Sequence, residues 1–250
     1  MEVHHPHHAT HKKKFGEYVM EFFMLFFAVF LGFIAENIRE NVSERKHAKE
    51  MAVSLIEELK HDTAEIHSAS GSLQMVRNYA DSVMTELDKP RSVRNDTALL
   101  LYATVELLHY DFFDAQTGTY EEIKSSGALR YFPQSLAYKM SFYEQWKNYI
   151  AKITDGDLYY YRTLLLPLCE KISNPRFLQA LQDKKSYHGT CFNPPLDTET
   201  EDLLYKRASH IKRAYEAQII LMGKHEKQAV NLINALQKEY DLKNEEEKSE

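Results

Sequence analysis

The sequence predicts an all-α protein: an N-terminal transmembrane helix that continues into a stalk, followed by an elongated helical bundle with a long C-terminal helix. Residues 22–35 read FFMLFFAVFLGFIA and carry no charge. Behind this run, apolar residues recur at spacings of three and four, the period of a helix that is buried on one face. Eight Gly and seven Pro in 250 residues are too few for a turn-rich β-sandwich.

These patterns divide the chain into five predicted segments. They are a flexible His- and Lys-rich leader (1–14), the transmembrane helix (15–38), the stalk helix (39–88), the helical bundle (89–240) and a disordered acidic tail (241–250).

The apolar run has the length of a membrane span. A helix needs about 20 mostly apolar residues to cross the hydrocarbon core, and Tyr18–Ile38 meets this need if Glu21 and Glu36 lie near the two interfaces. A secretory signal would end at a small-residue cleavage site, whereas this run passes directly into Glu36-Asn37. A core helix is rarely apolar on all sides. We therefore expect an uncleaved membrane anchor.

Positive charges near the span predict its orientation. Lys12, Lys13 and Lys14 lie directly before it, whereas the basic residues after it are interleaved with acids. Because Lys and Arg favour the cytoplasmic side, we expect the N-terminus in the cytoplasm and the C-terminal domain outside it. On that side Cys169 and Cys191 are either a disulfide or two unrelated thiols.

Helical signals follow along the rest of the chain. An amphipathic helix is predicted over 43–67, with a kink at 68–72, and it continues over 73–87 to a stop at Lys89-Pro90. Further helices are predicted over 97–112 with Asn95 or Asp96 as the N-cap, 119–126 ended by Gly127, 134–153, 157–172 with a kink at Pro167, and 177–182, and a loop over 186–196.

The last helix is predicted over Thr198–Tyr240, which contains no Pro. Its apolar stripe consists of Leu204, Ala208, Ile211, Tyr215, Ile219, Met222, Val230, Ile233 and Leu236.

A mid-chain motif, TYEEIKSSGALR at 119–130, carries a resemblance, as does the start, where Gly16-Glu17 precedes the span and Asn37 follows it. The chain resembles a family of uncharacterised bacterial single-pass membrane proteins with a T-Y-x-E-L-K-S-S-G-x-L-R-like segment, departing from it by Ile123 and by the Phe-rich span. The resemblance implies a helical fold and membrane attachment. With the orientation predicted from charge, we expect the chain in the bacterial inner membrane with its C-terminal domain in the periplasm. It implies no activity and no catalytic residues.

The motif has two interpretations on its own residues. It is either a packed helix and turn, with Tyr120 on the buried face and Gly127 as the C-terminal cap, or a polar corner that binds a ligand or partner. The interaction candidates of this corner are Tyr120, Glu122, Lys124, Ser126 and Arg130.

The E-x-x-H pattern is the main enzymatic signal. Glu58/His61 and Glu106/His109 each place a carboxylate and an imidazole on one helical face, as in di-iron bundles. No such pair occurs in the C-terminal helices, so a di-metal oxidoreductase is only a remote alternative. The leader HHPHHATH is either a metal-binding or a flexible basic segment.

The sequence contains none of the common catalytic or nucleotide-binding motifs, G-x-S-x-G, G-x-x-x-x-G-K-[ST] or G-x-G-x-x-G. A formal net charge of −6 argues against nucleic acid as a partner. We predict no enzyme activity and no cofactor.

The remaining hypothesis is a membrane-anchored, non-catalytic protein that acts in protein interaction, as a scaffold or as an assembly subunit, with another protein or a second copy as partner. Glu17 and Glu21, at the membrane edge, are further interaction candidates because acids there often face protein. The alternative is a ligand-binding sensor domain that signals through a separate partner.

Overall fold

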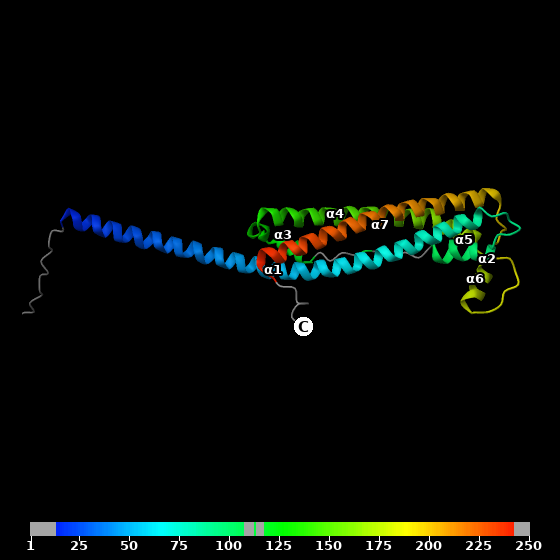
Figure 1. Cartoon of the computed structure of the whole chain (residues 1–250), viewed down its shortest axis with the longest axis horizontal. Coiled ribbons are helices and arrows are strands. Elements are labelled where there is room, and N and C mark those ends of the chain that lie inside the picture. Colours follow the sequence, from blue (N-terminus) through cyan, green and yellow to red (C-terminus); the bar gives the residue numbers. More distant parts are fainter. Residues whose placement is uncertain (1–13, 108–112, 114–117, 243–250) are drawn as a thin grey trace, which may run out of the picture. The chain divides into compact units, whose positions relative to one another are not determined.

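The computed structural model describes residues 14–107, 113 and 118–242. The regular elements of this part are all helical, which confirms the all-α prediction (Figure 1). They are α1 (Phe15–Leu87), α2 (Asp96–Leu101), the π-helical turn η1 (Tyr102–Glu106), α3 (Gly118–Ser125), the 3₁₀ turn η2 (Ala128–Tyr131), α4 (Gln134–Tyr160), the π-helical turn η3 (Tyr161–Leu165), α5 (Leu166–Ile172), α6 (Pro175–Gln182) and α7 (Thr198–Tyr240).

The chain forms two compact units, residues 1–50 and 51–250. The boundary lies within α1, so the segment predicted as a stalk (39–88) is divided between them. Residues 51–87 belong to the same unit as the predicted bundle because their apolar side chains are buried there, Leu59 to 1% exposure and Leu73 to 3%.

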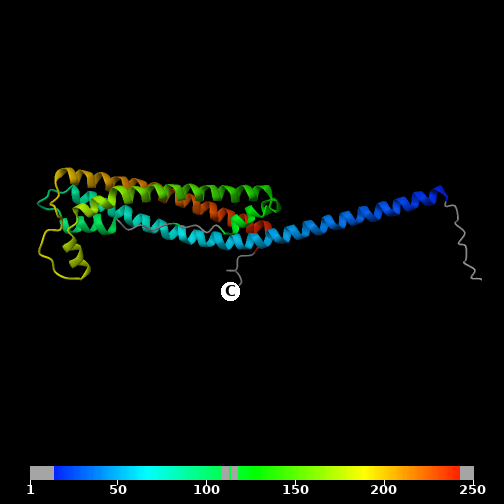
Figure 2. The same cartoon turned by 180° about the vertical axis from the view of Figure 1, so that it is seen from behind.

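Three long helices build the second unit: residues 51–87 of α1, α4 and α7, of which α4 and α7 lie side by side in both views (Figures 1 and 2). Each presents a seam of buried residues at alternating spacings of three and four, the 3.5-residue repeat of coiled-coil packing. The seams are Ala52, Leu55, Leu59, Asp62, Ile66, Ala69, Leu73, Val76, Ala80 and Val83 in α1; Leu136, Met140, Tyr143, Lys147 and Ile150 in α4; and Leu204, Ala208, Ile211, Tyr215, Gln218, Met222, His225, Ala229, Leu232 and Leu236 in α7.

Two predicted interruptions are helical in the structure. The chain continues as α1 through 68–72, because Ala69 and Leu73 extend the buried seam without a break. Likewise, α4 passes through Gly156, where two separate helices were predicted. A mid-helix Gly costs only about 1 kcal/mol, and α4 packs against α7.

The bounds of α7 confirm the predicted Thr198–Tyr240, but its buried face differs from the predicted stripe in the second half. Val230 is 44% exposed and Ile233 is half-buried, whereas Gln218 and His225 are buried. The seam keeps its 3.5-residue period and therefore buries two polar residues. The predicted stripe instead included only apolar or aromatic residues, and it therefore left out Gln218 and His225.

The short elements lie near the ends of the long helices, α3 at one end and α2, α5 and α6 at the other (Figures 1 and 2). α3 ends as predicted at Gly127, whose φ of 74° is left-handed. At Pro167, where a kink was predicted, the path is helical: the π turn η3 leads from α4 into α5. The predicted loop at 186–196 contains no helix, only a bridge between Ser173 and Phe192.

Candidate interaction surface

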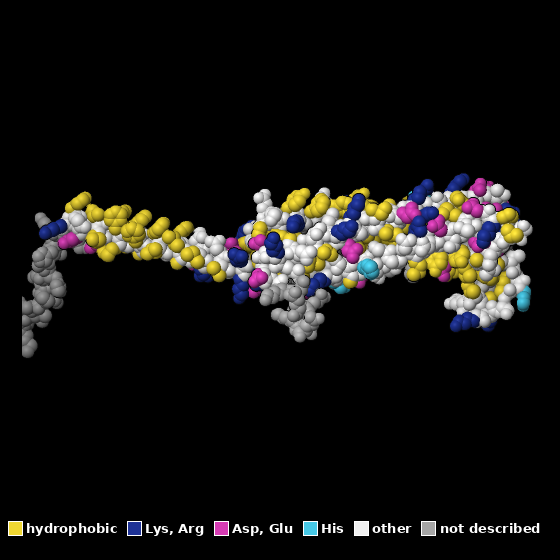
Figure 3. All heavy atoms as spheres, viewed as in Figure 1, with side chains coloured by type: hydrophobic (Ala, Val, Ile, Leu, Met, Phe, Trp, Pro, Cys, Tyr) yellow, Lys and Arg dark blue, Asp and Glu magenta, His cyan; other side chains and the backbone are white. Residues whose placement is uncertain are grey.

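The first unit exposes its apolar side chains. Among residues 15–42, Phe33 is 75% exposed and Leu25 is 69% exposed, and hydrophobic side chains cover this part of α1 (Figure 3). By length and composition, α1 contains a stretch that could cross a membrane. Of the two candidates at its start, Glu17 is exposed and accepts a bond from the backbone N of Lys14 at 3.3 Å, while Glu21 is half-buried.

The mid-chain motif forms a helix and a turn. Tyr120 is buried and its hydroxyl bonds Ser141 Oγ at 3.3 Å, and Gly127 ends the helix. The predicted polar residues Glu122, Lys124, Ser126 and Arg130 are all exposed.

Three of these four polar side chains, those of Lys124, Ser126 and Arg130, have a local contact. Lys124 pairs with Glu121 at 3.7 Å, Ser126 Oγ donates to the Glu122 carbonyl at 2.7 Å, and the Arg130 guanidinium lies 4.9 Å from the ring centre of Tyr131. These are contacts that stabilise the turn, and they match the interpretation as a packed helix and turn.

The remote metal candidates lie in different places. Glu58 is 8% exposed and its carboxylate accepts the backbone N–H of Thr119 at 2.8 Å, so it caps the start of α3. The Glu106 carboxylate raises the pKa of Tyr79 by its charge. Tyr79 is 21 residues beyond Glu58 on the same helix, or roughly 31 Å at 1.5 Å per residue, so Glu58 and Glu106 lie near distant points of α1.

Within the described residues, no group of three or more His, Cys, Asp or Glu side chains could hold a metal ion. His61 is exposed. His109 and the His-rich leader up to residue 13 lie outside the described residues, as does the acidic tail from residue 243.

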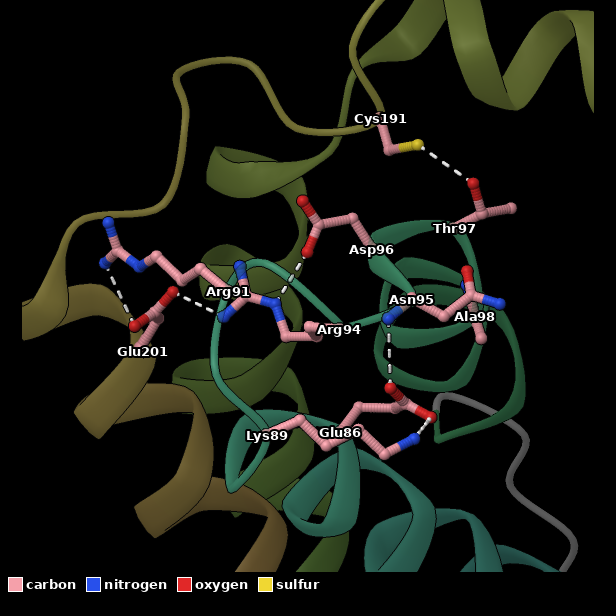
Figure 4. Close-up of polar contacts among 10 residues, drawn as sticks. All are labelled: Glu86, Lys89, Arg91, Arg94, Asn95, Asp96, Thr97, Ala98, Cys191 and Glu201. Atoms are coloured by element: carbon pink, nitrogen blue, oxygen red, sulfur yellow. Dashed lines mark hydrogen bonds and ion pairs between the residues drawn. The ribbon is translucent and has the colours of Figure 1, made fainter.

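The two cysteines are free thiols with separate partners in the structure. Cys169 is buried and its thiol bonds the Ala103 carbonyl at 3.1 Å. Cys191 is half-buried, with its sulfur 3.2 Å from the Thr97 hydroxyl (Figure 4). The possible Cys169–Cys191 disulfide is therefore not formed here.

Polar groups occupy the centre of the bundle. Asp62 is fully buried and accepts a bond from the Tyr143 hydroxyl at 2.8 Å, while the Tyr143 ring stacks on His225 with 4.3 Å between centroids. Burial raises the pKa of Tyr143 and lowers that of His225 to about 4, and the nearby Lys147 ammonium also lowers the latter. Lys147 pairs with Glu144. All but Glu144 occupy seam positions, where polar residues fix the register of packed helices.

Ion pairs join the start of α7 to the connection between α1 and α2 (Figure 4). The Arg94 side chain is 5% exposed and donates to the carboxylates of Asp96 and Glu201, each at 2.6 Å. Arg91 binds the other oxygen of Glu201 at 3.0 Å. Each of these charges has an opposite partner, so the cluster fixes the ends of the helices.

The same connection caps α2. The Asn95 side chain accepts the Ala98 N–H at 3.0 Å, which selects Asn95 over Asp96 as the N-cap (Figure 4). Glu86 accepts from the Asn95 backbone N at 3.1 Å and from Lys89 Nζ at 2.7 Å, and the Lys89 ammonium lowers the pKa of Glu86. These contacts serve the fold.

An aromatic stripe lies on the outer side of α4, where the fold does not use it. We define it as Tyr138, Phe142, Trp146 and Tyr149, whose rings form a continuous row of contacts with centroids 6.0, 6.3 and 6.0 Å apart. Tyr138 is 69% exposed, Phe142 37% and Tyr149 51%. At 100° per residue the four lie within about 80° of one another, on the side away from the buried seam. Hydrophobic side chains are visible along this edge of α4 (Figure 3).

The flanks of the aromatic stripe are basic. Exposed Lys139 and Lys152 lie on opposite sides of it, and the acid between them on α4, Glu144, is half-buried and paired with Lys147. The surface is therefore aromatic along its middle and positively charged at its edges.

This stripe was not predicted from the sequence, although its spacing of four, four and three is visible there. Tyr143 and other apolar residues occupy the opposite face of the same helix. When the burial of each residue is not known, both faces of α4 are equally compatible with a position in the core.

Comparison of the chain with protein-family models, with curated proteins and with solved structures finds no match. The resemblance to the family of single-pass membrane proteins therefore stays a prediction.

Proposed function

We propose that this chain is a membrane-anchored, non-catalytic helical protein that binds another protein through the aromatic stripe of α4. The single observation that carries this proposal is the row of Tyr138, Phe142, Trp146 and Tyr149 on a surface that the fold leaves open. Tyr and Trp are enriched at protein interfaces and dominate their binding energy. A contiguous apolar patch on a folded unit typically marks such an interface.

Charge supports a different protein, rather than a second copy, as the occupant. If two copies paired through the stripe, the interface would contain four lysines, Lys139 and Lys152 of each copy, whereas the one acid between them on α4, Glu144, is already paired with Lys147. Like charges across an interface are unfavourable. The fitting partner is an amphipathic helix with an apolar seam flanked by acidic residues.

The anchor in this proposal is the apolar part of α1, with the N-terminus in the cytoplasm and the second unit on the other side of the inner membrane. Its support is the exposed apolar surface of residues 15–42 and the basic residues directly before it. Glu17 and Glu21, at the edge of the span, remain candidates for contact with a membrane partner.

Photo-crosslinking in cells tests the proposal on the full-length chain. A photoreactive phenylalanine analogue replaces Tyr138 or Tyr149 in separate variants, and the control replaces Tyr159, which is 70% exposed on α4 but lies outside the stripe. We expect one adduct of the same mass from positions 138 and 149 and none from position 159. The double variant K139E/K152E should weaken that adduct, because it reverses both flanking charges.

Two outcomes would contradict the proposal. An adduct of twice the chain's own mass would identify a second copy as the occupant. Failure of both stripe positions to give an adduct, or equal yield from position 159, would show that the stripe is no specific interface.

A further inference from the structure

A cavity of about 270 Å³ lies at the end of the bundle where η1, α5 and α6 meet. It is lined by Thr104 of η1; Leu166, Cys169 and Glu170 of α5; Ser173; and Pro175 and Leu178 of α6. Glu170 and Pro175 are exposed, so the cavity reaches the surface beside them. Its size is close to the lower end of the ~300–1,000 Å³ range of small-molecule sites.

The π turn η1 determines how Cys169 is held in this wall. In η1 the N–H of Leu107 bonds the Tyr102 carbonyl at 2.8 Å, five residues back, so it does not bond Ala103 as it would in an α-helix. The Ala103 carbonyl instead accepts the thiol of Cys169. Burial raises the pKa of Cys169 to about 12, so the group remains a thiol with its hydrogen directed at Ala103.

The two hydroxyl groups of the cavity wall also donate their hydrogens to backbone carbonyls. Thr104 Oγ1 donates to the Leu100 carbonyl at 2.7 Å, and Ser173 Oγ donates to the Cys169 carbonyl. A hydroxyl has one donor hydrogen and two acceptor lone pairs. Thr104 and Ser173 can therefore offer a molecule in the cavity only acceptor sites.

The chemistry of the wall defines the ligand class. The side chains of Thr104, Cys169 and Ser173 have no free donor, Glu170 adds a carboxylate with negative charge, and the rest of the wall is aliphatic. We propose that this cavity binds a small organic ammonium with a short apolar body, the ammonium donating to Glu170 and the hydroxyl oxygens. An organic carboxylate would find no donor among these side chains and would meet the charge of Glu170. This site is separate from the aromatic stripe and does not depend on the proposed interaction function.

Three probes that share a 2-phenylethyl group test the inference on the full-length protein in detergent. They are 2-phenylethylamine, 2-phenylethanol and 3-phenylpropionate, titrated by ligand-observed NMR. Because charge-assisted hydrogen bonds exceed neutral ones in strength, we expect the amine to bind about tenfold more tightly than the alcohol, and the carboxylate not to bind.

Variants assign the binding to the cavity. Glu170→Gln should weaken binding of the amine about tenfold and leave the alcohol unchanged, whereas the control Glu239→Gln, at an exposed glutamate of α7, should alter neither. Leu178→Trp should fill the cavity and abolish binding, whereas Leu181→Trp, on the same helix but outside the lining, should not. Equal affinity for amine and alcohol, no binding of the amine, or amine binding that survives both Glu170→Gln and Leu178→Trp would overturn the inference.

Discussion

Phe30 and Leu59 both belong to α1, yet Phe30 is 48% exposed and Leu59 is 1% exposed. The two parts of this helix differ in how their apolar residues are distributed. In residues 22–35 apolar side chains cover all sides, and Phe22, Phe26 and Phe30 stack in a row along the helix. In residues 52–83 most buried apolar side chains lie along one seam, and most residues on the remaining faces are polar.

The contrast shows that a helix's backbone does not determine what surrounds it. A helix that is apolar on all sides avoids water only in an apolar environment, whereas a helix with a single apolar seam can bury that seam against other helices.

Charges in the first part of α1 should prevent membrane integration. The double variant Phe26→Arg/Phe30→Arg places two cations near the centre of the span, at roughly 2.5–3.5 kcal/mol each. We expect the protein to move from the membrane fraction to the soluble or aggregated fraction, measured by alkaline extraction of membranes. The control Val53→Arg changes an exposed position of the second unit and should leave the protein in the membrane. Retention of the double variant would contradict the anchor.

A core truncation should destabilise the second unit by a smaller amount. Leu204 is fully buried, and Leu204→Ala should lower the free energy of unfolding by about 2–5 kcal/mol through lost burial and a cavity. Its neighbour Leu203 is 37% exposed, so Leu203→Ala should cost less than about 1 kcal/mol. Urea denaturation followed by far-UV circular dichroism measures both. Equal losses would mean that the seam of α7 is misplaced.

The buried histidine should make the second unit sensitive to acid. Burial lowers the pKa of His225 from 6.5 to about 4, so the unfolded chain binds the proton more readily than the folded one. The stabilising contribution of the neutral ring is therefore complete above pH 6.5 and is lost as the pH falls toward 4. The loss reaches about 3 kcal/mol, at 1.36 kcal/mol per pKa unit.

The variant His225→Phe keeps a ring against Tyr143 and removes the titration. Its free energy of unfolding should fall less than that of the parent chain between pH 7 and pH 4, measured by urea denaturation at each pH. Parallel pH profiles for the two proteins would show that His225 titrates in the same way folded and unfolded.

Two glycines should respond to alanine in opposite directions. Gly127 has a left-handed φ of 74°, so Gly127→Ala should cost about 1–2 kcal/mol although the space around it is open. Gly156 lies inside α4 with open space around it, so Gly156→Ala should stabilise by about 0.5–1 kcal/mol. Thermal denaturation compares the pair, and a shift in the same direction for both would contradict one of the two backbone assignments.

Local signals were enough to predict most of the helices. Thr198–Tyr240 and the cap at Gly127 follow from helix stop signals that act within a few residues. Gly156 and the segment 68–72 were predicted as interruptions because their local propensity is weak. The helices continue there because the seams on both sides are buried, which is a tertiary effect that no local window contains.

Surfaces and cavities were harder to predict than helices. Asp62, Gln218 and His225 are polar residues at buried positions. A prediction based on the spacing of apolar residues does not identify them as buried. Three of the four residues of the aromatic stripe are core-type residues at exposed positions, and Trp146 is half-buried, so the same criterion assigns them to the core. The cavity at Cys169 depends on η1, α5 and α6 meeting, which the sequence does not determine locally.

The π turns η1 and η3 make the local structure sensitive to the deletion of a single residue. Each turn holds one residue more than an α-helical path would need. Deleting one residue in η1 would restore the α pairing and leave the residues on either side on the same helical faces, because the wider π turn already absorbs the extra residue. The Ala103 carbonyl would return to the helix ladder and the thiol of Cys169 would lose its acceptor. A relative of this protein that is one residue shorter at this point would therefore keep the helix and lack the bond between Cys169 and Ala103.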